Sequence, residues 1–303
     1  MDGSELAKTI EVTTNIISGI IDRFFPYCGL TQKALDVYIS EIEKSDKPKE
    51  YKAWEVMRAK HEFKKLKNIN SIVEFAKEYC TEEEINKATY SDNEEWYDRF
   101  FENAGNVSAE SVQRIWGQIL ANEIKEKGNT PRSVISILSE IDSELAKAFS
   151  ILCEQRLIVV SLDEKDSYIS DQVINEVIKF EDNQYYRGKG LDLVTLNELE
   201  SIGLINSKSL GYVKCLPDAK KVIISDGIFT DCIVLKEERL SFGTIMLTKA
   251  GNYLLNIINP GFAHDQHDVM EKYYLKHGYK FEESPYKIKL VDNARFQIIA
   301  NID

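Results

Sequence analysis

The residues best suited to chemistry lie near the C-terminus, around the histidines His264 and His267. Two imidazoles three residues apart, with Glu271 four residues further on, could share one helix face and bind a divalent metal ion. Metal-binding helices more often space their histidines by four residues within a fuller motif. The neighbouring Asp265 and Asp268 also fit a polar, solvated helix start. We favour this second interpretation and keep His264, His267 and Glu271 only as candidate metal ligands.

A second pattern resembles the requirements of phosphodiester cleavage. Asp226 and Asp231 precede an apolar run at residues 233–235 that leads into Lys236. Two-metal cleavage needs clustered carboxylates, often with a lysine nearby. Val234 stands two residues before Lys236, where a second carboxylate would be expected. The sequence therefore disfavours a nuclease function, which stays one of the alternatives.

No other segment carries a recognisable reaction motif. The chain has no GxxxxGK[ST] or GxGxxG loop for a nucleotide and no GxSxG nucleophile turn. Residues 187–190 (RGKG) fit a flexible basic turn better than a phosphate-binding loop. The 5 cysteines are scattered without a CxxC pair, which is typical of reduced thiols and not of a zinc module. We therefore predict no catalytic residues and no cofactor.

Composition narrows the class of protein. A chain of 303 residues is long enough for one large domain or two to three small ones. Its 50 acidic and 38 basic residues give a net charge of −12, which disfavours a broad nucleic-acid surface but allows a small basic patch. No apolar run approaches the ~20 residues of a membrane-spanning helix. The N-terminus lacks a signal peptide's basic region and cleavage site, so we expect a cytoplasmic protein.

The elements that would position any site are clearest at residues 94–138, EEWYDRFFENAGNVSAESVQRIWGQILANEIKEKGNTPRSVISIL. Apolar residues recur there at helical spacing, and large aromatics on such a face usually fill a core. The spacing predicts one helix from a Ser108 cap to Gly128, a second after Thr130, and a third from about Asp142. The predicted structural core comprises Trp96, Phe100, Trp116, Leu120 and Ile124.

This segment resembles a bacterial family catalogued as domain of unknown function twenty-eight-oh-six. The resemblance is carried by the acidic-Trp-aromatic-Arg-Phe-Phe run ending at Phe101, by Val-Ser-x-Glu at residues 107–110, and by WGQILANEI at residues 116–124. A later match lies at Leu-Thr-Lys-Ala-Gly, residues 247–251. The WGQILANEI portion is also similar to the helical core of abortive-infection alpha proteins. The resemblance implies a bacterial accessory or phage-defence context and carries over no catalytic residue.

The first 25 residues predict an amphipathic helix at residues 6–25. Its apolar stripe follows heptad spacing that is interrupted once, at Thr13. Three explanations remain open: packing on the rest of the chain, self-association, or binding to a membrane surface. The polar face lacks the basic excess that favours anionic lipid. The predicted interaction residues are Leu6, Ile10, Ile17, Ile20 and Phe24.

Residues 30–90 read as charged helices. We expect one helix to about Lys44, a second at residues 49–67 and a short third at residues 69–79. The densest basic run of the chain lies in the second, at Lys60, Lys64, Lys65 and Lys67. Because glutamates are interleaved, this run fits a solvated helix face better than a nucleic-acid site.

The C-terminal half alternates short strands with helices. A helix at residues 193–202, Gly-Leu-Ile, several strands and a helix capped by Thr248 follow the order of a winged-helix module with an enlarged wing. Such modules bind DNA or proteins. The candidate recognition helix carries Glu198 and Glu200 and no basic residue, which argues against major-groove binding. A helix at residues 268–276 and a hairpin at residues 286–299 complete the chain.

Together these patterns predict an α+β, mainly α protein, with an N-terminal helical bundle followed by a winged-helix-like α+β C-terminal half. The expected regions are an amphipathic helix at residues 1–29, a helical region at 30–90, a family-like helical core at 91–157, a winged-helix-like domain at 158–259, and a helix with a hairpin at 260–303.

The expected function is that of a non-enzymatic interaction or sensor protein, plausible in phage defence, that forms homo-oligomers or binds a protein partner. Nucleic acid and a membrane surface are partners that the charge pattern disfavours. The alternatives are a metal-dependent nuclease effector, a membrane-acting effector working through residues 6–25, and a DNA-binding regulator.

Overall fold

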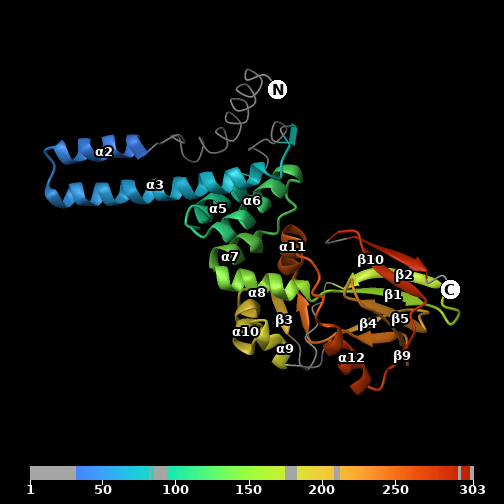
Figure 1. The fold of residues 1–303 in the computed structure, drawn as a ribbon. Coiled ribbons are helices and arrows are strands. Elements are labelled where there is room, and N and C mark those ends of the chain that lie inside the picture. The colour runs from blue at the N-terminus through green and yellow to red at the C-terminus, as the bar shows by residue number, and fades with distance from the viewer. Residues whose placement is uncertain are drawn as a thin grey trace. The chain divides into compact units, whose positions relative to one another are not determined.

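The computed structural model describes residues 32–81, 83–84, 94–174, 183–207, 212–292 and 295–300. It divides into two compact units, residues 1–140 and 141–303, of which the first is helical and the second contains the sheets (Figure 1). This is the predicted α+β, mainly α class. The division falls within the predicted region 91–157, so the third helix of that region belongs to the second unit.

The described part of the first unit begins with a helical hairpin. Helix α2 (Gln32–Lys44) and helix α3 (Lys49–Lys77) are joined by a short turn and pack against each other. The predicted end of a helix at residue 67 is wrong, because α3 continues unbroken for 29 residues. Asn68 stays within the helix, buried, and its side-chain amide donates a hydrogen bond to the carbonyl of Gly105 over 2.8 Å. The hydrogen bond to Gly105 thus pairs the Asn68 side chain, which could otherwise bond to its own backbone and end the helix.

Three further helices belong to the described part of the first unit: α5 (Glu94–Ala104), α6 (Glu110–Lys125) and α7 (Arg132–Glu140). Helix α6 packs along the second half of α3, and α5 packs on α3 and α7. The α3–α6 contact is close because Gly117 has no side chain. A Cβ atom there would lie 2.6 Å from Cβ of Phe75 and 2.9 Å from the carbonyl oxygen of Ile72.

An aromatic cluster lies at the centre of these helices. Trp96 stacks on Phe100 with ring centroids 4.9 Å apart, and Phe100 meets Trp116 edge-on at 5.0 Å. All three are buried, as is Leu120, whereas Ile124 is only half-buried. The tryptophans therefore fill space between helices, and their burial accounts for much of the apolar area of this unit.

The predicted helix ends differ in detail from the structure. The Ser108 cap is wrong: Ala109 occupies the N-cap position, without a side-chain hydrogen bond, and α6 starts at Glu110. Helix α6 ends at Lys125, and Gly128 follows in the loop with a φ of 72°. Helix α7 starts one residue after Pro131. Asp142 caps the next helix by accepting hydrogen bonds from the backbone N–H groups of residues 144 and 145, which confirms that prediction.

The second unit is built on an antiparallel five-stranded sheet of order β2-β1-β5-β6-β9. A separate hairpin of β10 and β11 supplies Ile288 and Phe296 to the apolar core over β1 and β5. Strand β1 is buried along its whole length, as its continuous apolar run predicts. The strands are β1 (Leu157–Leu162), β2 (Tyr168–Ile174), β5 (Lys221–Ser225), β6 (Thr230–Val234), β9 (Lys280–Glu282), β10 (Tyr286–Leu290) and β11 (Phe296–Ala300).

The second unit also contains two short strand pairs outside the five-stranded sheet, β3 with β8 and β4 with β7. Helix α8 packs on α10 and α11. The predicted order of helix, strands and Thr248-capped helix is observed, and the Thr248 hydroxyl accepts the N–H of Gly251. The elements are α8 (Ser143–Glu154), α9 (Asn183–Gly188), α10 (Leu193–Ser201), β3 (Ile205–Ser207), β4 (Val213–Cys215), β7 (Arg239–Ser241), β8 (Ile245–Leu247), α11 (Lys249–Ile258) and α12 (His267–Lys276).

The glycine of the Leu-Thr-Lys-Ala-Gly match has a packing role. Gly251 lies in the first turn of α11, where a Cβ atom would be 2.2 Å from the carbonyl oxygen of Leu204. Leu204 directly precedes β3, so this glycine lets α11 approach the chain at the start of that strand. Any larger residue at this position would push the helix away.

Candidate functional site

The candidate metal ligands are used in other contacts. The Nδ1 atom of His267 lies 3.0 Å from Oδ2 of Asp231, and the His267 ring stacks on Phe229 with centroids 4.5 Å apart. The Nδ1 atom of His264 lies 3.2 Å from the backbone oxygen of Asp226. Within the described ranges, no group of three or more His, Cys, Asp and Glu side chains is arranged to hold a metal ion. Burial raises the pKa of the Asp231 carboxyl group, and the negative charge of Glu271 adds a smaller contribution in the same direction.

The carboxylates of the nuclease alternative are arranged for structure. Asp226 is buried at the β5–β6 turn, and its Oδ1 accepts the backbone N–H groups of Ile228 and Phe229 at 3.0 and 2.8 Å. Burial raises the pKa of Asp231. Lys236 donates to the carbonyl of His277 over 2.9 Å. The two aspartates therefore hold a turn and a histidine in place, with the lysine engaged elsewhere.

Three of the described cysteines, Cys80, Cys153 and Cys232, are poor nucleophiles. Burial raises the pKa of Cys80 and of Cys232 to about 11, and it raises the pKa of the fully buried Cys153 further. A thiol needs a lowered pKa to react readily at neutral pH. These three side chains behave as small apolar groups.

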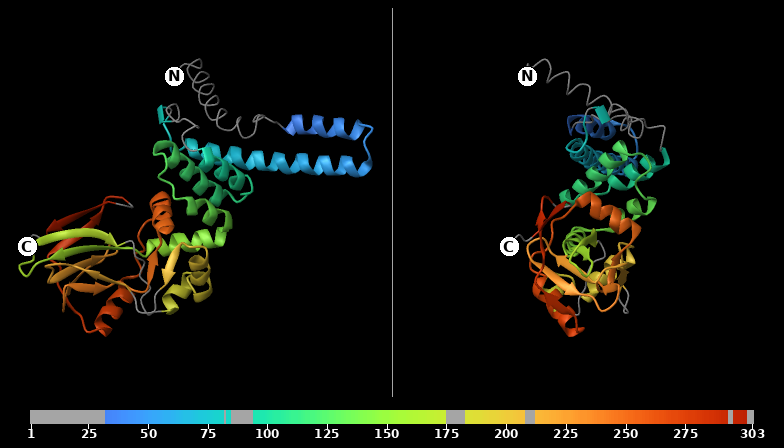
Figure 2. Two further views of the ribbon diagram at one scale, coloured as in Figure 1. Left: turned by 180° about the vertical axis from the view of Figure 1, so that it is seen from behind. Right: turned by 90° about the vertical axis from the view of Figure 1, so that its right-hand side faces the viewer.

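The strongest candidate for a functional surface is the hairpin formed by α2 and residues 49–66 of α3, which we call the arm. Figures 1 and 2 show it extending from the other helices of its unit. Only Leu35 of α2 is buried. Large apolar side chains face outward from both helices, with Trp54 61% and Met57 56% exposed. The other exposed apolar residues of the arm are Val37, Tyr38 and Tyr51.

A groove runs between the two helices of the arm. It has a volume of about 350 Å³, and Glu62 is the one charged residue among its lining residues. Tyr38, at its rim, is 47% exposed. The lining residues are Ala34, Leu35, Tyr38, Ala59, Glu62, Phe63 and Leu66. A groove of this composition can accept apolar side chains from another helix.

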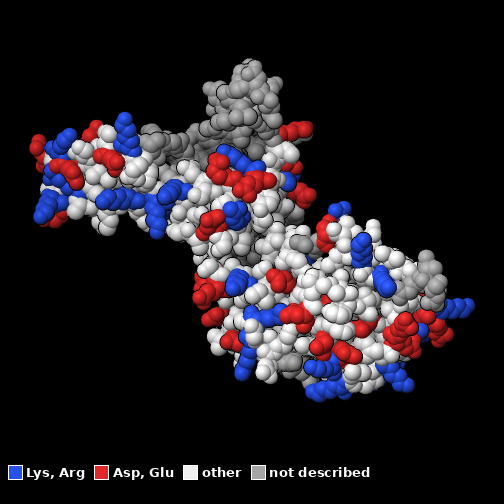
Figure 3. Space-filling view, viewed as in Figure 1, with Lys and Arg blue, Asp and Glu red and all other residues white. Residues whose placement is uncertain are grey.

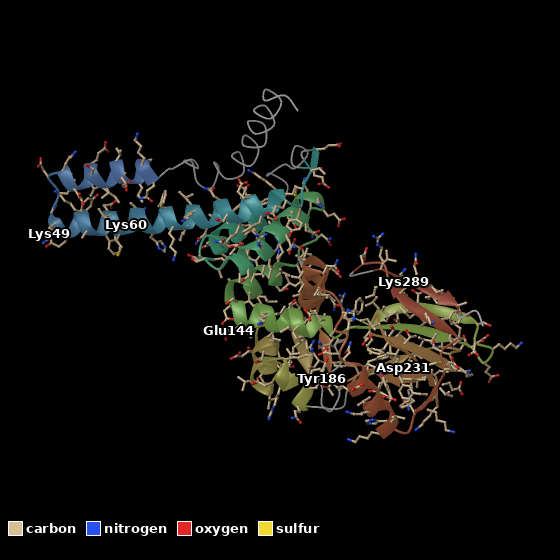
Figure 4. The ribbon with its side chains drawn as sticks, viewed as in Figure 1. Lys49, Lys60, Glu144, Tyr186, Asp231 and Lys289 are labelled. Atoms are coloured by element: carbon tan, nitrogen blue, oxygen red, sulfur yellow. The ribbon has the colours of Figure 1, made fainter. Side chains whose placement is uncertain are left out.

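The basic run lies on another face of the same helix. Lys60, Lys64 and Lys67 are exposed and share one face at spacings of four and three residues. Ala59, Phe63 and Leu66 repeat on a different face, toward the groove. Figure 3 shows Lys and Arg side chains along α3, and Figure 4 labels Lys49 and Lys60 on the arm. The apolar groove and the lysines are therefore separate surfaces.

The predicted interaction residues Leu6, Ile10, Ile17, Ile20 and Phe24 lie outside the described residues. The exposed apolar residues of the arm were not predicted from the sequence, because charged residues dominate the pattern of residues 49–67. The available signal was the placement of Trp54 and Met57 away from the face of Val56 and Phe63. Of the helices that the structure describes, none has the length and apolar character needed to cross a membrane.

Helix α10, the candidate recognition helix, presents a mixed surface. Its first two residues, Leu193 and Val194, are each 65% exposed. The carboxylate of Glu200 accepts the backbone N–H of Ser207 over 2.9 Å, which connects α10 with β3. Glu198 contributes a second negative charge to this helix. This combination suits a protein partner better than phosphate groups.

Comparison with known proteins identifies one relationship. A family model described as protein of unknown function (DUF2806) matches residues 55–270. Neither the curated proteins nor the solved structures give a match to the chain. The matched range contains most of α3 and the aromatic cluster, and it ends within α12. It covers well over half of the chain, which therefore belongs to the DUF2806 family.

Proposed function

We propose that this DUF2806 protein is a non-enzymatic interaction and sensor protein, and that its arm binds the arm of a second copy. The observation that carries the proposal is the exposed apolar surface of the arm, which comprises its groove together with Trp54 and Met57, 61% and 56% exposed. When α2 and residues 49–66 of α3 pack only against each other, these apolar side chains remain exposed to water. A partner that covers this surface would stabilise both.

A second copy is the partner that fits the geometry best. Two helical hairpins that pack through their apolar faces form a four-helix bundle, a common closed arrangement. A twofold axis would place each groove opposite the same residues of its partner, so one patch serves both sides. Tyr38 at the rim and Phe63 within the groove provide apolar groups that such a pairing would bury. The heptad stripe predicted at residues 6–25 directly precedes this region and could extend the same interface.

The biological setting of the proposal is bacterial defence against phage. This setting rests on a resemblance noted from the sequence alone, that of residues 116–124 to the helical core of abortive-infection alpha proteins. An interaction arm would suit a defence protein that acts by sensing and assembly. The buried or paired state of the candidate nucleophiles and acids also favours a protein that works by contact.

We also propose that the part containing α10, β3, β8 and α11 is a winged-helix-like module that contacts protein. Its element order fits such a module, and exposed Leu193 and Val194 supply an apolar contact at the start of α10. The carboxylates of Glu198 and Glu200 would repel nucleic-acid phosphates. This module would form a second contact surface, independent of the arm.

The arm proposal is tested by co-purification of two differently tagged copies expressed together. The wild-type copies should co-purify, and Tyr38→Glu in both copies should reduce recovery of the second copy by about tenfold or more, because burying one carboxylate costs several kcal/mol. Tyr168→Glu is the matched control, since Tyr168 is similarly exposed, at 49%, and lies on β2. Equal recovery with Tyr38→Glu and wild type would contradict the proposal.

A further inference from the structure

A small pocket lies within the segment that identifies the family. It has a volume of about 230 Å³ and is formed by the first two turns of α5, the loop after α6 and the start of α7. Its lining residues all come from residues 94–138: Glu95, Trp96, Arg99, Gly128, Thr130, Arg132 and Ile135. This volume is below the range of about 300–1,000 Å³ typical of sites for drug-sized ligands. The pocket suits a small molecule or a single chemical group.

Charge is concentrated at this pocket. Nη2 of Arg99 lies 3.1 Å from Oε1 of Glu95, and Nη2 of Arg132 lies 3.4 Å from Oε2 of the same carboxylate. One carboxylate is therefore shared between two guanidinium groups, one from α5 and one from α7. The three charged lining residues carry a net positive charge. Arg132 is well exposed, so its side chain can move to meet a ligand.

Trp96, which lines the pocket, has an unused hydrogen-bond donor. Trp96 is 4% exposed, and its indole N–H has no acceptor in the described part of the chain. A buried donor without a partner costs about 1–3 kcal/mol and calls for an explanation. Ile135 adds a buried apolar side to the same pocket. A ligand with an acceptor group could pair with this donor after a small shift of the indole ring.

Hydrogen bonds to a buried carboxylate fix the loop after α6, which lines one side of the pocket. Glu123 is fully buried, and its carboxylate accepts the N–H of Gly128 at 2.7 Å and of Thr130 at 3.3 Å. Gly128 has a φ of 72°, and a Cβ atom built on it would meet no other atom within 4 Å. The loop is thus ordered by buried hydrogen bonds while its outer side stays open. Such preorganisation is typical of binding sites.

We infer that this pocket binds a small anion through Arg99 and Arg132, and that Glu95 occupies the anion position when no ligand is present. Guanidinium groups bind carboxylate and phosphate groups through paired N–H donors, and the Glu95 carboxylate already shows this interaction from within the chain. The ligand class is a carboxylate or a phosphate monoanion. This inference goes beyond the proposed function and does not depend on the arm, although a ligand pocket would give a sensor its signal.

Substitutions of the acidic and the basic residues of the pocket should change its affinity for an anion in opposite directions. Calorimetric titration would use inorganic phosphate and acetate as separate probes at constant ionic strength. Glu95→Gln should tighten binding, because it removes the internal competitor. Arg132→Gln should weaken binding about tenfold, the change expected for losing one hydrogen bond to a charged group. Arg58→Gln is the control, since Arg58 lies on α3 and does not line the pocket.

The outcomes separate the possibilities. Binding of phosphate alone assigns a phosphate group, and binding of acetate alone assigns a carboxylate. The inference is overturned if neither probe binds the full-length protein. It is also overturned if Arg132→Gln binds like wild type, or if Glu95→Gln fails to tighten binding. A purely structural role for the ion pairs predicts no change in anion affinity. Because co-purification of tagged copies measures the arm separately, failure here leaves the proposed function untouched.

Discussion

At the scale of single residues, much of the chemistry of this chain serves structure. Thr81 and Glu84 form a capping box, in which each side chain bonds the backbone N–H of the other, as their spacing predicts. Asp226 holds a turn, and Glu123 holds a loop. The sequence could indicate which residue types are able to do chemistry. The sequence could not show that these side chains form hydrogen bonds and ion pairs within the fold, because their partners lie far away along the chain.

The buried carboxylate of Glu123 gives the first residue-scale prediction. Glu123→Ala leaves the N–H groups of Gly128 and Thr130 without their acceptor, so the free energy of unfolding should fall by about 2–4 kcal/mol. Urea denaturation would measure the change. Glu102→Ala on the exposed side of α5 is the control and should alter stability little. Equal stability of the two variants would show that the loop does not depend on Glu123.

The raised pKa of Asp231 gives a prediction about pH. Burial raises its pKa above the ordinary value of 3.8, with Glu271 and Asp226 adding to the effect and His267 opposing it. The folded state therefore binds the proton more tightly than the unfolded state. Stability from this group is present at low pH and is lost as pH rises through the folded-state pKa.

Asp231→Asn should consequently be more stable than wild type at neutral pH, and this difference in the free energy of unfolding should narrow as pH falls through the raised folded-state pKa toward the ordinary value of 3.8. Urea denaturation at a series of pH values would follow it. Figure 4 labels Asp231 in the sheet unit, on a strand remote in sequence from the arm. A variant that is less stable than wild type at neutral pH would mean that the contact with His267 outweighs the cost of burial.

At the scale of elements, the sequence predicted what local patterns control. Helices α8, α11 and α12 and strand β10 lie where periodicity and capping residues predict them, and α6 differs in its cap, Ala109 in place of Ser108. The continuity of α3 was missed because Asn68 is satisfied by Gly105, 37 residues away. The short strands β4, β7 and β9 have three residues each, too few for a periodic signal, and they exist through pairing with distant partners.

The close approach of α3 and α6 gives an element-scale prediction. Gly117→Ala would place a Cβ atom against Phe75 and the backbone of Ile72, so the helices must move apart, at a cost of about 1–3 kcal/mol. Thermal unfolding would show a lower Tm. Gly188→Ala is the control, because a Cβ at that position meets no atom within 4 Å. A Gly117→Ala protein as stable as this control would contradict the packing described for the two helices.

The candidate sites were less predictable than the elements. The sequence singled out histidines and aspartates, which the structure places in turns and pair contacts. The arm depends on exposure, and exposure of Trp54 or Tyr38 cannot be read from periodicity alone, because a helix can bury either face. The pocket depends on joining α5 to α7 through Glu95 and Arg132, which lie 37 positions apart. Segment 94–138 was expected only to build a scaffold, yet it also encloses this cavity.

At the scale of the whole molecule, the chain belongs to the DUF2806 family and combines a helical unit with a sheet unit. The central claim is that copies of it associate through the arm. In that account the apolar groove of Tyr38 and Phe63 is covered by a second chain. The net charge of −12 would oppose further association of the dimers in that account.

Static light scattering over a series of protein concentrations tests this claim most directly. One chain has a mass of 34.8 kDa. The account predicts a mass of twice that value at micromolar concentration for wild type and for Tyr168→Glu, and the mass of a single chain for Tyr38→Glu. A wild-type protein that keeps the mass of one chain throughout the series would contradict it.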